Sequence, residues 1–475
     1  MTFDFRLLVL TYADAQAYLY SRLPVDYRIG PKAIKPGLGN IIRLCHALGN
    51  PQARFPSIHV AGTNGKGSTA HLLASVYQSA GYRVGLYTSP HLKSFTERVR
   101  INGQPISEDR VAEFVRTNKP LIEAIEPSFF EMTVALAFAY FGGQDFGLPP
   151  VDLAIIEVGL GGRLDSTNII TPDLSIITNI GWDHTDILGD TLDAIAAEKA
   201  GIIKPGVPVV VGETLPETRS VFADVAAQRK ALIHWAETTF SVVDAGLESG
   251  LRRAMVSRLP GRLTPVPDTA TIGSEAAEQG WPDSFPIRCD LPGLYQLANL
   301  RTVLTAVGAL QSRYPVSLAM LQRGVSSVVS QTNLKGRWQQ LMLPATTKSL
   351  AQSPRQPLVV ADTAHNQPGL VALLETVRSI PHRQLHLILG LVADKDRSRV
   401  LSVLPVTARY YFCQAQLPRA LSARDLQQEA ATYNLPGDVF TDVNQALKAA
   451  LAVAESTDLV LVTGSNYVIA EINNL

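Results

Sequence analysis

Residues 57–81 read SIHVAGTNGKGSTAHLLASVYQSAG, which is an apolar run, a glycine-rich turn and a helical pattern in direct succession. The glycines let backbone N–H groups approach phosphate oxygens, and the start of a helix adds positive potential. Lys66 can reach the outer phosphates, and Ser68 can face a phosphate or its metal ion. The spacing departs from the common GxxxxGK[ST] loop, because Val60 replaces its first glycine and Gly67 follows the lysine. A plain turn needs neither the lysine nor the serine, so the stretch predicts a phosphate-binding loop.

Short apolar runs alternate with helical patterns on both sides of this loop. Strands are expected at 57–62, 83–89, 152–159, 174–180 and 207–212, with helices at 68–80, 108–124, 130–141 and 191–201. Apolar strands separated by helices predict a parallel sheet covered on both faces. Residues 240–292 are rich in Gly, Pro and Ser and suggest loops and short strands at the edge of this unit, before a helix at 296–312.

The alternation restarts after the polar stretch 326–336. Strands are expected at 357–363, 385–391, 409–414 and 458–464, with helices at 367–378, 396–403, 421–433 and 443–455. We therefore predict an α/β chain with a P-loop parallel-sheet domain at 1–332 and a smaller, Rossmann-like α/β domain at 333–475.

Composition excludes several classes of protein. The 475 residues contain 42 Lys and Arg and 42 Asp and Glu, so the net charge is zero and nothing indicates nucleic-acid binding. The three cysteines are far apart, which argues against disulfides or a zinc site and fits a reducing compartment. The first residues lack the basic segment of a signal peptide, and no run of about 18 apolar residues predicts a membrane span. We expect a cytoplasmic protein.

Two further polar segments follow predicted strands of the first unit. Glu157 ends the run DLAIIE and precedes a glycine cluster, so it is either a magnesium partner or a helix cap. His184 lies in TNIGWDHTDILG and is either structural or a metal ligand, although magnesium prefers oxygen and a histidine also suits manganese. Because carboxyl ends of parallel strands meet at one sheet edge, both residues are expected beside the phosphate loop.

Lys199 and the segment 361–368 are harder to interpret. Near a predicted helix end, Lys199 would ordinarily be an exposed lysine paired with the helix dipole. Asp362 can accept hydrogen bonds from a ribose, and His365 and Asn366 can reach phosphates. A helix N-cap is the competing interpretation of Asn366.

Taken together, the motifs resemble the folylpolyglutamate synthase and dihydrofolate synthase family of Mur ligases, from about residue 38 onward. They are GTNGKGS (62–68), YTSPHL (87–92), TERVRING (96–103), EVGLGGRLDSTN (157–168), TNIGWDHTDILG (178–189), EKAGIIK (198–204), GRW (336–338), DTAHNQPG (362–369), DKD (394–396) and TGS (463–465). SPHL together with GLGGRLD distinguishes this family from cell-wall Mur ligases. The segment RIGPKAIKPGLGN, at 28–40, matches no pattern of the family that we recognise.

The resemblance implies a central ATP-binding domain with an N-terminal extension, followed by a Mur-ligase C-terminal domain. It implies an ATP-dependent ligase that adds L-glutamate to dihydropteroate, to reduced folates or to both, through an acyl phosphate. ATP and Mg²⁺ are the expected cofactors, and a monomer is expected, without nucleic-acid or membrane partners. The alternatives are another Mur-type amide ligase acting on a cell-wall precursor and a non-catalytic P-loop regulator.

The resemblance also implies roles for individual residues. The metal ligands would be Ser89, Glu157 and His184, and Lys199 would be carbamylated, which replaces its interpretation as an exposed lysine. Nucleotide contacts would come from Thr63, Asn64, Gly65, Lys66, Gly67, Ser68, Asn299, Arg337 and Asp362. The pterin substrate would contact Ser128, Phe129, Phe130, Glu131, Leu164, Asp165 and Ser166, with a helix cap as the alternative for Asp165. Lys66, Lys199 and His365 would be catalytic.

Overall fold

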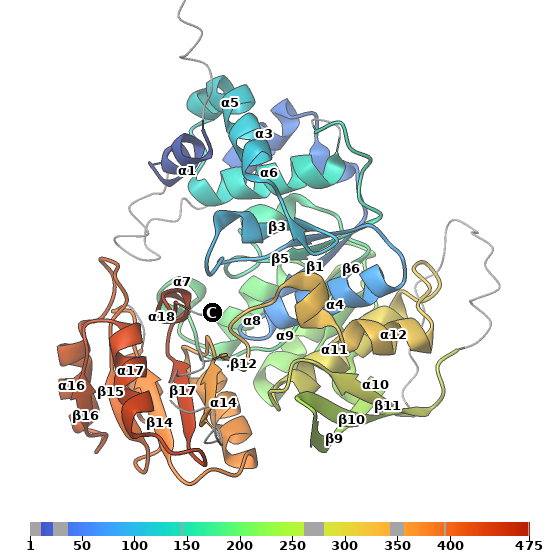
Figure 1. The fold of residues 1–475 in the computed structure, drawn as a ribbon. Coiled ribbons are helices and arrows are strands. Elements are labelled where there is room, and N and C mark those ends of the chain that lie inside the picture. The colour runs from blue at the N-terminus through green and yellow to red at the C-terminus, as the bar shows by residue number, and fades with distance from the viewer. Residues whose placement is uncertain are drawn as a thin grey trace, which may run out of the picture.

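The computed structural model describes residues 11–21, 37–143, 146–260, 280–342, 356–393, 396–473 and 475. Most of the 28–40 segment, the middle of 240–292 and the first two residues of DKD therefore lie outside the described residues. Two sheets, each made mostly of parallel strands, lie side by side in Figure 1. The chain completes the first sheet before it begins the second.

The first sheet has eight strands in the order β4-β3-β2-β5-β1-β6-β7-β8. Its strands are β1 (Ser57–Ala61), β2 (Val84–Tyr87), β3 (Val99–Ile101), β4 (Gln104–Pro105), β5 (Leu153–Glu157), β6 (Leu174–Ile177), β7 (Val209–Val211) and β8 (Ile233–Trp235). The six strands from β2 to β8 pair in parallel, whereas β3 and β4 form an antiparallel edge. The predicted parallel sheet is confirmed.

Helices cover both faces of this sheet (Figure 1). One group comprises α1 (Tyr12–Ser21), α3 (Gly39–Ala47), α5 (Glu108–Ile125) and α6 (Phe129–Gly142); its apolar residues share a core with Tyr87 and Ile156. On the other face, α4 (Lys66–Ser79), α11 (Gln296–Ala309) and α12 (Leu318–Val325) pack around Ile58 and Val60. The remaining helices of this unit are α7 (Thr185–Leu188), α8 (Leu192–Ala200), α9 (Pro216–Gln228), α10 (Ala236–Thr239) and α13 (Val328–Thr332).

A three-stranded antiparallel sheet lies beside α11, in the order β11-β10-β9. Its strands are β9 (Phe240–Glu248), β10 (Leu251–Arg258) and β11 (Ser284–Cys289), so strands are present where loops and short strands were expected, and β9 and β10 are longer than expected. Alternate residues of β11 are buried, and Phe285 and Ile287 join the core around α4 and α11. The Gly, Pro and Ser that obscured these strands lie mainly in the connection between β10 and β11.

The second sheet has six strands in the order β12-β13-β17-β14-β15-β16, parallel except for β12. Its strands are β12 (Gln339–Gln340), β13 (Leu358–Ala361), β14 (Leu385–Leu389), β15 (Arg409–Phe412), β16 (Gly437–Val439) and β17 (Leu459–Thr463). The helices are α14 (Gln367–Ser379), α15 (Arg397–Leu401), α16 (Ala423–Ala431), α17 (Val443–Val453) and α18 (Asn466–Ala470). Separate apolar clusters fill its two faces, which confirms the predicted second α/β unit.

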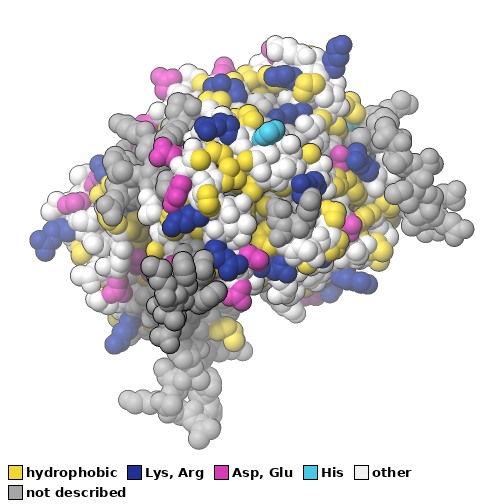
Figure 2. Space-filling model, turned by 90° about the horizontal axis from the view of Figure 1, so that it is seen from above, with side chains coloured by type: hydrophobic (Ala, Val, Ile, Leu, Met, Phe, Trp, Pro, Cys, Tyr) yellow, Lys and Arg dark blue, Asp and Glu magenta, His cyan; other side chains and the backbone are white. Residues whose placement is uncertain are grey.

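The surface agrees with the balanced composition. On the face shown in Figure 2, basic and acidic side chains are interspersed among apolar ones. None of the helices in the described ranges is long and apolar enough to cross a membrane.

Candidate active site

A cleft of about 800 Å³ lies where the two sheets approach each other. The first unit lines it with the whole phosphate loop and with Ser89, Glu157, His184 and Lys199, and the second with Arg337, Asp362 and His365. Most of these residues follow the carboxyl ends of parallel strands, which is where α/β proteins bind ligands. The residues predicted to hold nucleotide and metal therefore meet in one place.

Neighbouring residues fix the conformation of the phosphate loop. Gly65 caps α4 with φ +82°, which favours glycine. The backbone N–H of Asn64 donates to Asn179 Oδ1 at 2.9 Å, and its carbonyl accepts from the Thr178 hydroxyl at 2.5 Å. A Cβ atom on Gly62 would overlap Thr178 Oγ1. The TNIG segment therefore fixes the backbone of the loop at residues 62 and 64.

Two lysine side chains meet at one carbonyl oxygen. Lys66 Nζ donates to the Gly62 and Thr63 carbonyls at 3.0 and 3.1 Å, and Lys199 Nζ donates to the same Gly62 carbonyl at 3.0 Å. Lys199 is buried, so the simpler interpretation of an exposed lysine is wrong. Burial, assisted by the charge of Lys66, lowers the pKa of Lys199 to about 7. A substantial fraction of its amine is therefore neutral near neutral pH.

Glu157 is a buried acid beside the phosphate loop. Burial raises its pKa, whereas the charge of Lys66 opposes that shift. Its Oε2 accepts a hydrogen bond from the backbone N–H of Ser89 at 3.0 Å, which brings the β2 and β5 ends together. A Cβ atom on Gly67 would lie 3.5 Å from Glu157 Oε1 and 3.7 Å from Arg337 Nη2. Gly67 therefore lies directly beside both the acid and the arginine.

The donor set suits a divalent cation. Within the described residues, no three His, Cys, Asp or Glu side chains form a group that could hold a metal ion. Any metal site at Glu157 and His184 therefore needs a further donor, such as the Ser89 hydroxyl. These groups line the same cleft and fit a metal in chemical type. Their role as ligands stays a prediction.

The second unit contributes charged and polar groups opposite the loop. Asp362 is buried and accepts hydrogen bonds from the Tyr295 hydroxyl at 2.5 Å, Trp338 N at 2.8 Å and Ala364 N at 2.9 Å. Burial raises the pKa of Asp362, while the Arg337 charge opposes the shift.

Asn299 lies on α11 of the first unit, beside the phosphate loop. Its Nδ2 donates to Gln296 Oε1 at 2.8 Å, and a Cβ atom on Gly65 would clash with its Oδ1.

His365 has one ring nitrogen committed to the backbone. Nδ1 lies 2.9 Å from the Thr363 carbonyl, which can only accept, so Nδ1 carries the proton of the neutral ring. Nε2 lies 3.5 Å from Asp183 Oδ2. Nε2 is therefore the ring nitrogen that faces Asp183 in the cleft.

Comparison with known proteins now identifies the family. Residues 349–466 match the family described as Mur ligase, glutamate ligase domain. The dihydrofolate synthase/folylpolyglutamate synthase of Bacillus subtilis is 32% identical over 472 residues, covering 97% of this chain and 98% of that protein. The chain belongs to the dihydrofolate synthase/folylpolyglutamate synthase family of Mur ligases.

Solved structures of this family extend the likeness to the whole fold. Escherichia coli FolC in complex with DHPP and ADP has 30% identity and a TM-score of 0.74, covering 97% of each chain. A bifunctional folylpolyglutamate synthase/dihydrofolate synthase with Mn, AMPPNP and L-glutamate bound has 29% identity and a TM-score of 0.75, covering 97% of this chain and 96% of that one. The predicted α/β Mur-ligase fold is confirmed.

The segments expected to bind pterin in this family have structural tasks in the chain. Ser128 and Glu131 form a capping box at the start of α6. Phe129 stacks on Tyr20, with ring centroids 5.5 Å apart, and Phe130 packs against Gly159. Phe130 thereby contacts the glycine-rich loop after β5, and the substrate role of these four residues stays a prediction.

Asp165 is a helix cap, as the alternative interpretation proposed. Its carboxylate accepts hydrogen bonds from Thr167 N at 3.0 Å, Thr167 Oγ1 at 2.5 Å and Leu160 N at 2.9 Å. Leu164 is 40% exposed, and Ser166 begins a 3-10 helix (Ser166–Ile169). Both carboxylate oxygens of Asp165 therefore already accept hydrogen bonds within the chain. Contact between Asp165 and a pterin stays a prediction.

Several residues that line the cleft were not predicted from the sequence. Asp183 accepts from Asn366 Nδ2 at 2.9 Å, and Asn179 and Tyr295 also line the cleft. Asp183 precedes His184 within the quoted motif, so its position in TNIGWDHTDILG was the available signal. The cap interpretation of Asn366 is confirmed, because its Oδ1 accepts from Gly369 N at 2.9 Å.

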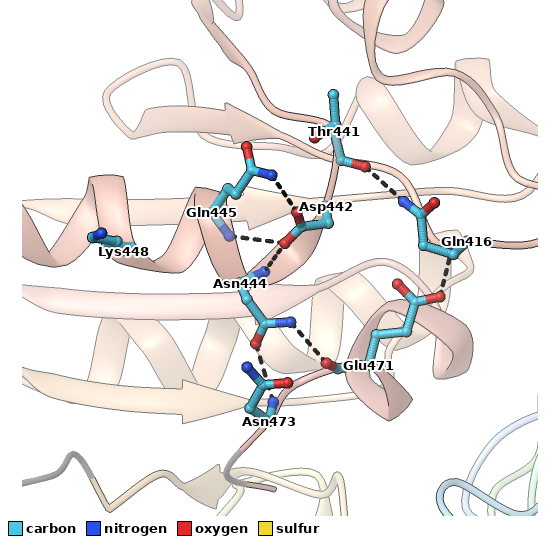
Figure 3. Close-up of a pocket in the computed structure, with 8 residues that line it drawn as sticks. All are labelled: Gln416, Thr441, Asp442, Asn444, Gln445, Lys448, Glu471 and Asn473. Carbon is cyan, nitrogen blue, oxygen red and sulfur yellow. Dashed lines mark hydrogen bonds between the residues drawn. The ribbon is translucent and has the colours of Figure 1, made fainter.

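A second hollow, of about 760 Å³, lies in the second unit around the start of α17 (Figure 3). Its polar groups bond to one another: Gln416 N donates to Glu471 Oε1 at 2.5 Å, and Asn444 Nδ2 donates to the Glu471 carbonyl at 2.9 Å. Asp442 caps the helix. These contacts explain the polar lining as a structural network joining α17 to the residues after α18.

Replacing Asp362 with Asn is expected to raise the Michaelis constant for ATP about tenfold, because a charged hydrogen-bond partner becomes neutral. The amide keeps the side-chain shape but removes the charge opposite Arg337. Steady-state kinetics with ATP as the varied substrate measure the effect, with Asp442→Asn as the control in the same unit. An unchanged ATP constant together with a raised acceptor constant would assign Asp362 to the wrong substrate.

Proposed function

We propose that this chain joins the amino group of L-glutamate to the carboxylate of both dihydropteroate and reduced folates in one ATP-dependent active site. The chain is a ligase, a dihydrofolate synthase/folylpolyglutamate synthase, by similarity to enzymes of this family over nearly its whole length. The observation that carries the proposal is the cleft itself. A phosphate loop, a buried acid and two lysines bonded to one carbonyl face the second sheet there.

The chemistry proceeds through an acyl phosphate. A carboxylate oxygen of the acceptor attacks the γ-phosphorus of ATP, and the bond to ADP breaks. The glutamate amine then attacks the acyl carbon, the C–O bond to phosphate breaks, and an amide forms with loss of a proton. Lys66, once released from the Gly62 carbonyl, and Arg337 offset negative charge on the phosphoryl oxygens.

The nucleotide would be held from both units. The phosphate loop residues 63–68 face the triphosphate, Asn299 lies beside the loop, and Arg337 and Asp362 approach from the second sheet. ADP or an ATP analogue is bound in the two related structures described above, which supports this placement. Since both units supply contacts, turnover requires them to come together.

A divalent cation would be held by Ser89, Glu157 and His184, with Lys199 nearby. We propose Mg²⁺, and the Mn-bound relative supports a divalent ion. When bound, the ion neutralises charge on the phosphoryl oxygens.

Lys199 would act as a carbamate. The lone pair of its neutral amine attacks CO₂, a nitrogen–carbon bond forms and one proton is released. The pKa of about 7 supports this step, because the neutral amine is available at neutral pH. The product places an anion among the cationic groups of the loop.

Glutamate would enter from a hollow of about 360 Å³ that adjoins the cleft. His365, Asp183, Trp182 and Arg399 line it, and the Arg399 guanidinium lies 4.5 Å from the Trp182 ring centroid. A related structure holds L-glutamate. The basic Nε2 of His365 is suited to accept the proton that the glutamate amine loses.

The acceptor would approach from the opposite side, where residues 128–131 and 164–166 border the glycine-rich loop. The carboxylate of dihydropteroate lies one glutamate closer to the pterin ring than that of a folate. One phosphate and metal apparatus can serve both acceptors if the pterin binds at different depths. The division into domains 1–332 and 333–475 and the monomeric state remain part of the proposal.

A substrate panel with labelled glutamate tests the function. Purified protein, ATP and Mg²⁺ are incubated with dihydropteroate, with tetrahydrofolate or with a nucleotide-sugar peptide acceptor, and labelled amide is counted. We expect product with both pterin acceptors and none with the third. Labelling of tetrahydrofolate alone would leave a polyglutamylation enzyme, and labelling of the nucleotide-sugar acceptor alone would overturn the folate assignment.

A further inference from the structure

We propose that Asn366 is a positioning residue, which sets the phosphate loop through Asn64 when the two units close. The side chains of Asn64 and Asn366 form a reciprocal amide pair, although the residues are 302 positions apart. Asn64 Nδ2 donates to Asn366 Oδ1 at 3.0 Å, and Asn366 Nδ2 donates to Asn64 Oδ1 at 3.1 Å. The proposal rests on the ATP-dependent function above.

The backbone of Asn64 leaves its side chain as the adjustable part of the loop. Its N–H and carbonyl are both bonded to residues 178 and 179 of the first unit. Its amide group, in contrast, is bonded to the second unit. Through the side chain of Asn64, the position of the second sheet can therefore affect the position of the phosphate loop.

Asn366 is suited to this task because every polar atom of its amide has a partner. Besides the two bonds to Asn64, Nδ2 donates to Asp183 Oδ2 at 2.9 Å, and Oδ1 accepts from Gly369 N at 2.9 Å. Only 4% of the residue is exposed. One amide thus caps α14 and reaches two loops of the first unit at once. Neutral amide pairs contribute modestly to stability, so the pair can break when products leave.

The substitution Asn366→Ser separates these tasks. Serine caps helices as well as asparagine does, but its hydroxyl is too short to reproduce the pair with Asn64. We expect the affinity for AMPPNP with Mg²⁺ to fall about tenfold, because three hydrogen bonds across the cleft are lost, two to Asn64 and one to the Asp183 carboxylate. The Michaelis constant for ATP should rise by the same factor. The Michaelis constant for the acceptor, measured at saturating ATP, should stay unchanged, and so should the midpoint of thermal unfolding. Asp442→Ser, at the N-cap of α17 and remote from the cleft, is the matched control.

Nucleotide affinity is measured by titration calorimetry on the full chain without acceptor, so the result does not depend on which acceptor the enzyme uses. A second comparison introduces Asn366→Ser into an Asn64→Ala background, where it should have no further effect on affinity. Unchanged AMPPNP affinity in Asn366→Ser would overturn the proposal, as would an equal loss in the Asp442→Ser control. Losses that multiply in the double variant would show that Asn366 acts independently of Asn64. Failure of the acceptor panel, in contrast, would leave these binding results intact.

Discussion

Replacing Lys199 with alanine is expected to lower turnover about 100-fold, in the range seen when a group that organises a metal site is lost. The side chain is buried and bonded to the phosphate loop, and the neutral form of its amine can gain a carboxylate group by reaction with CO₂. Initial rates with saturating ATP, with and without added bicarbonate, measure the effect. Bicarbonate should stimulate the unmodified protein and not the variant.

The pH dependence has a defined sign. Burial depresses the pKa of Lys199 from 10.5 to about 7, so the reactive neutral amine predominates above pH 7 and disappears below it. Stimulation by bicarbonate should therefore fade as the pH drops below 7. Between those two pKa values the unfolded chain binds a proton that the native chain does not, so this lysine makes stability rise with pH. Lys204→Ala removes a neighbouring lysine that only bonds the Asn168 carbonyl, and serves as the control. Full activity of the Lys199 variant would contradict the assignment.

Replacing Lys66 with methionine is expected to lower turnover about a thousandfold, the scale of losing a group that stabilises transition-state charge. In the structure the ammonium group rests on the Gly62 and Thr63 carbonyls, beside the buried Glu157. Its removal takes away the largest influence that lowers the pKa of Glu157, so this acid should become harder to ionise.

Single-turnover rates and AMPPNP affinity together separate the two roles of Lys66. A loss of rate with affinity retained within about tenfold would place the lysine at the transferring phosphate. Lys448→Met, at an exposed lysine of α17, is the control and should leave both quantities unchanged. A variant that retains the normal rate would show that Lys66 only closes the loop.

The parts of this site that depend on local sequence could be predicted. The strand, glycines and helix start around Lys66 adjoin one another, so their geometry follows from the chain itself. Glu157 and His184 were expected at the same edge because each follows an apolar strand of a parallel sheet. The same reasoning placed Asp362 after the first long strand of the second unit.

Other features depend on contacts between distant residues and could not be predicted. Lys199 is buried with its Nζ bonded to the carbonyl of Gly62, 137 positions away, whereas its sequence suggests a solvent-facing helix end. The pairing of Asn64 with Asn366 requires the relative position of the two sheets. For Asp165, a cap and a ligand-binding carboxylate have the same sequence pattern, and only its hydrogen-bond partners distinguish them.

The order of the two sheets along the chain has a consequence during synthesis. The phosphate loop leaves the ribosome about 270 residues before Arg337, the first contact from the second unit, because the two stand at positions 66 and 337. Domains generally fold as units as they emerge, so the first sheet can be complete while its partner is still being translated. Until then the cleft has only one wall, and the nascent chain can neither enclose a nucleotide nor waste it by hydrolysis.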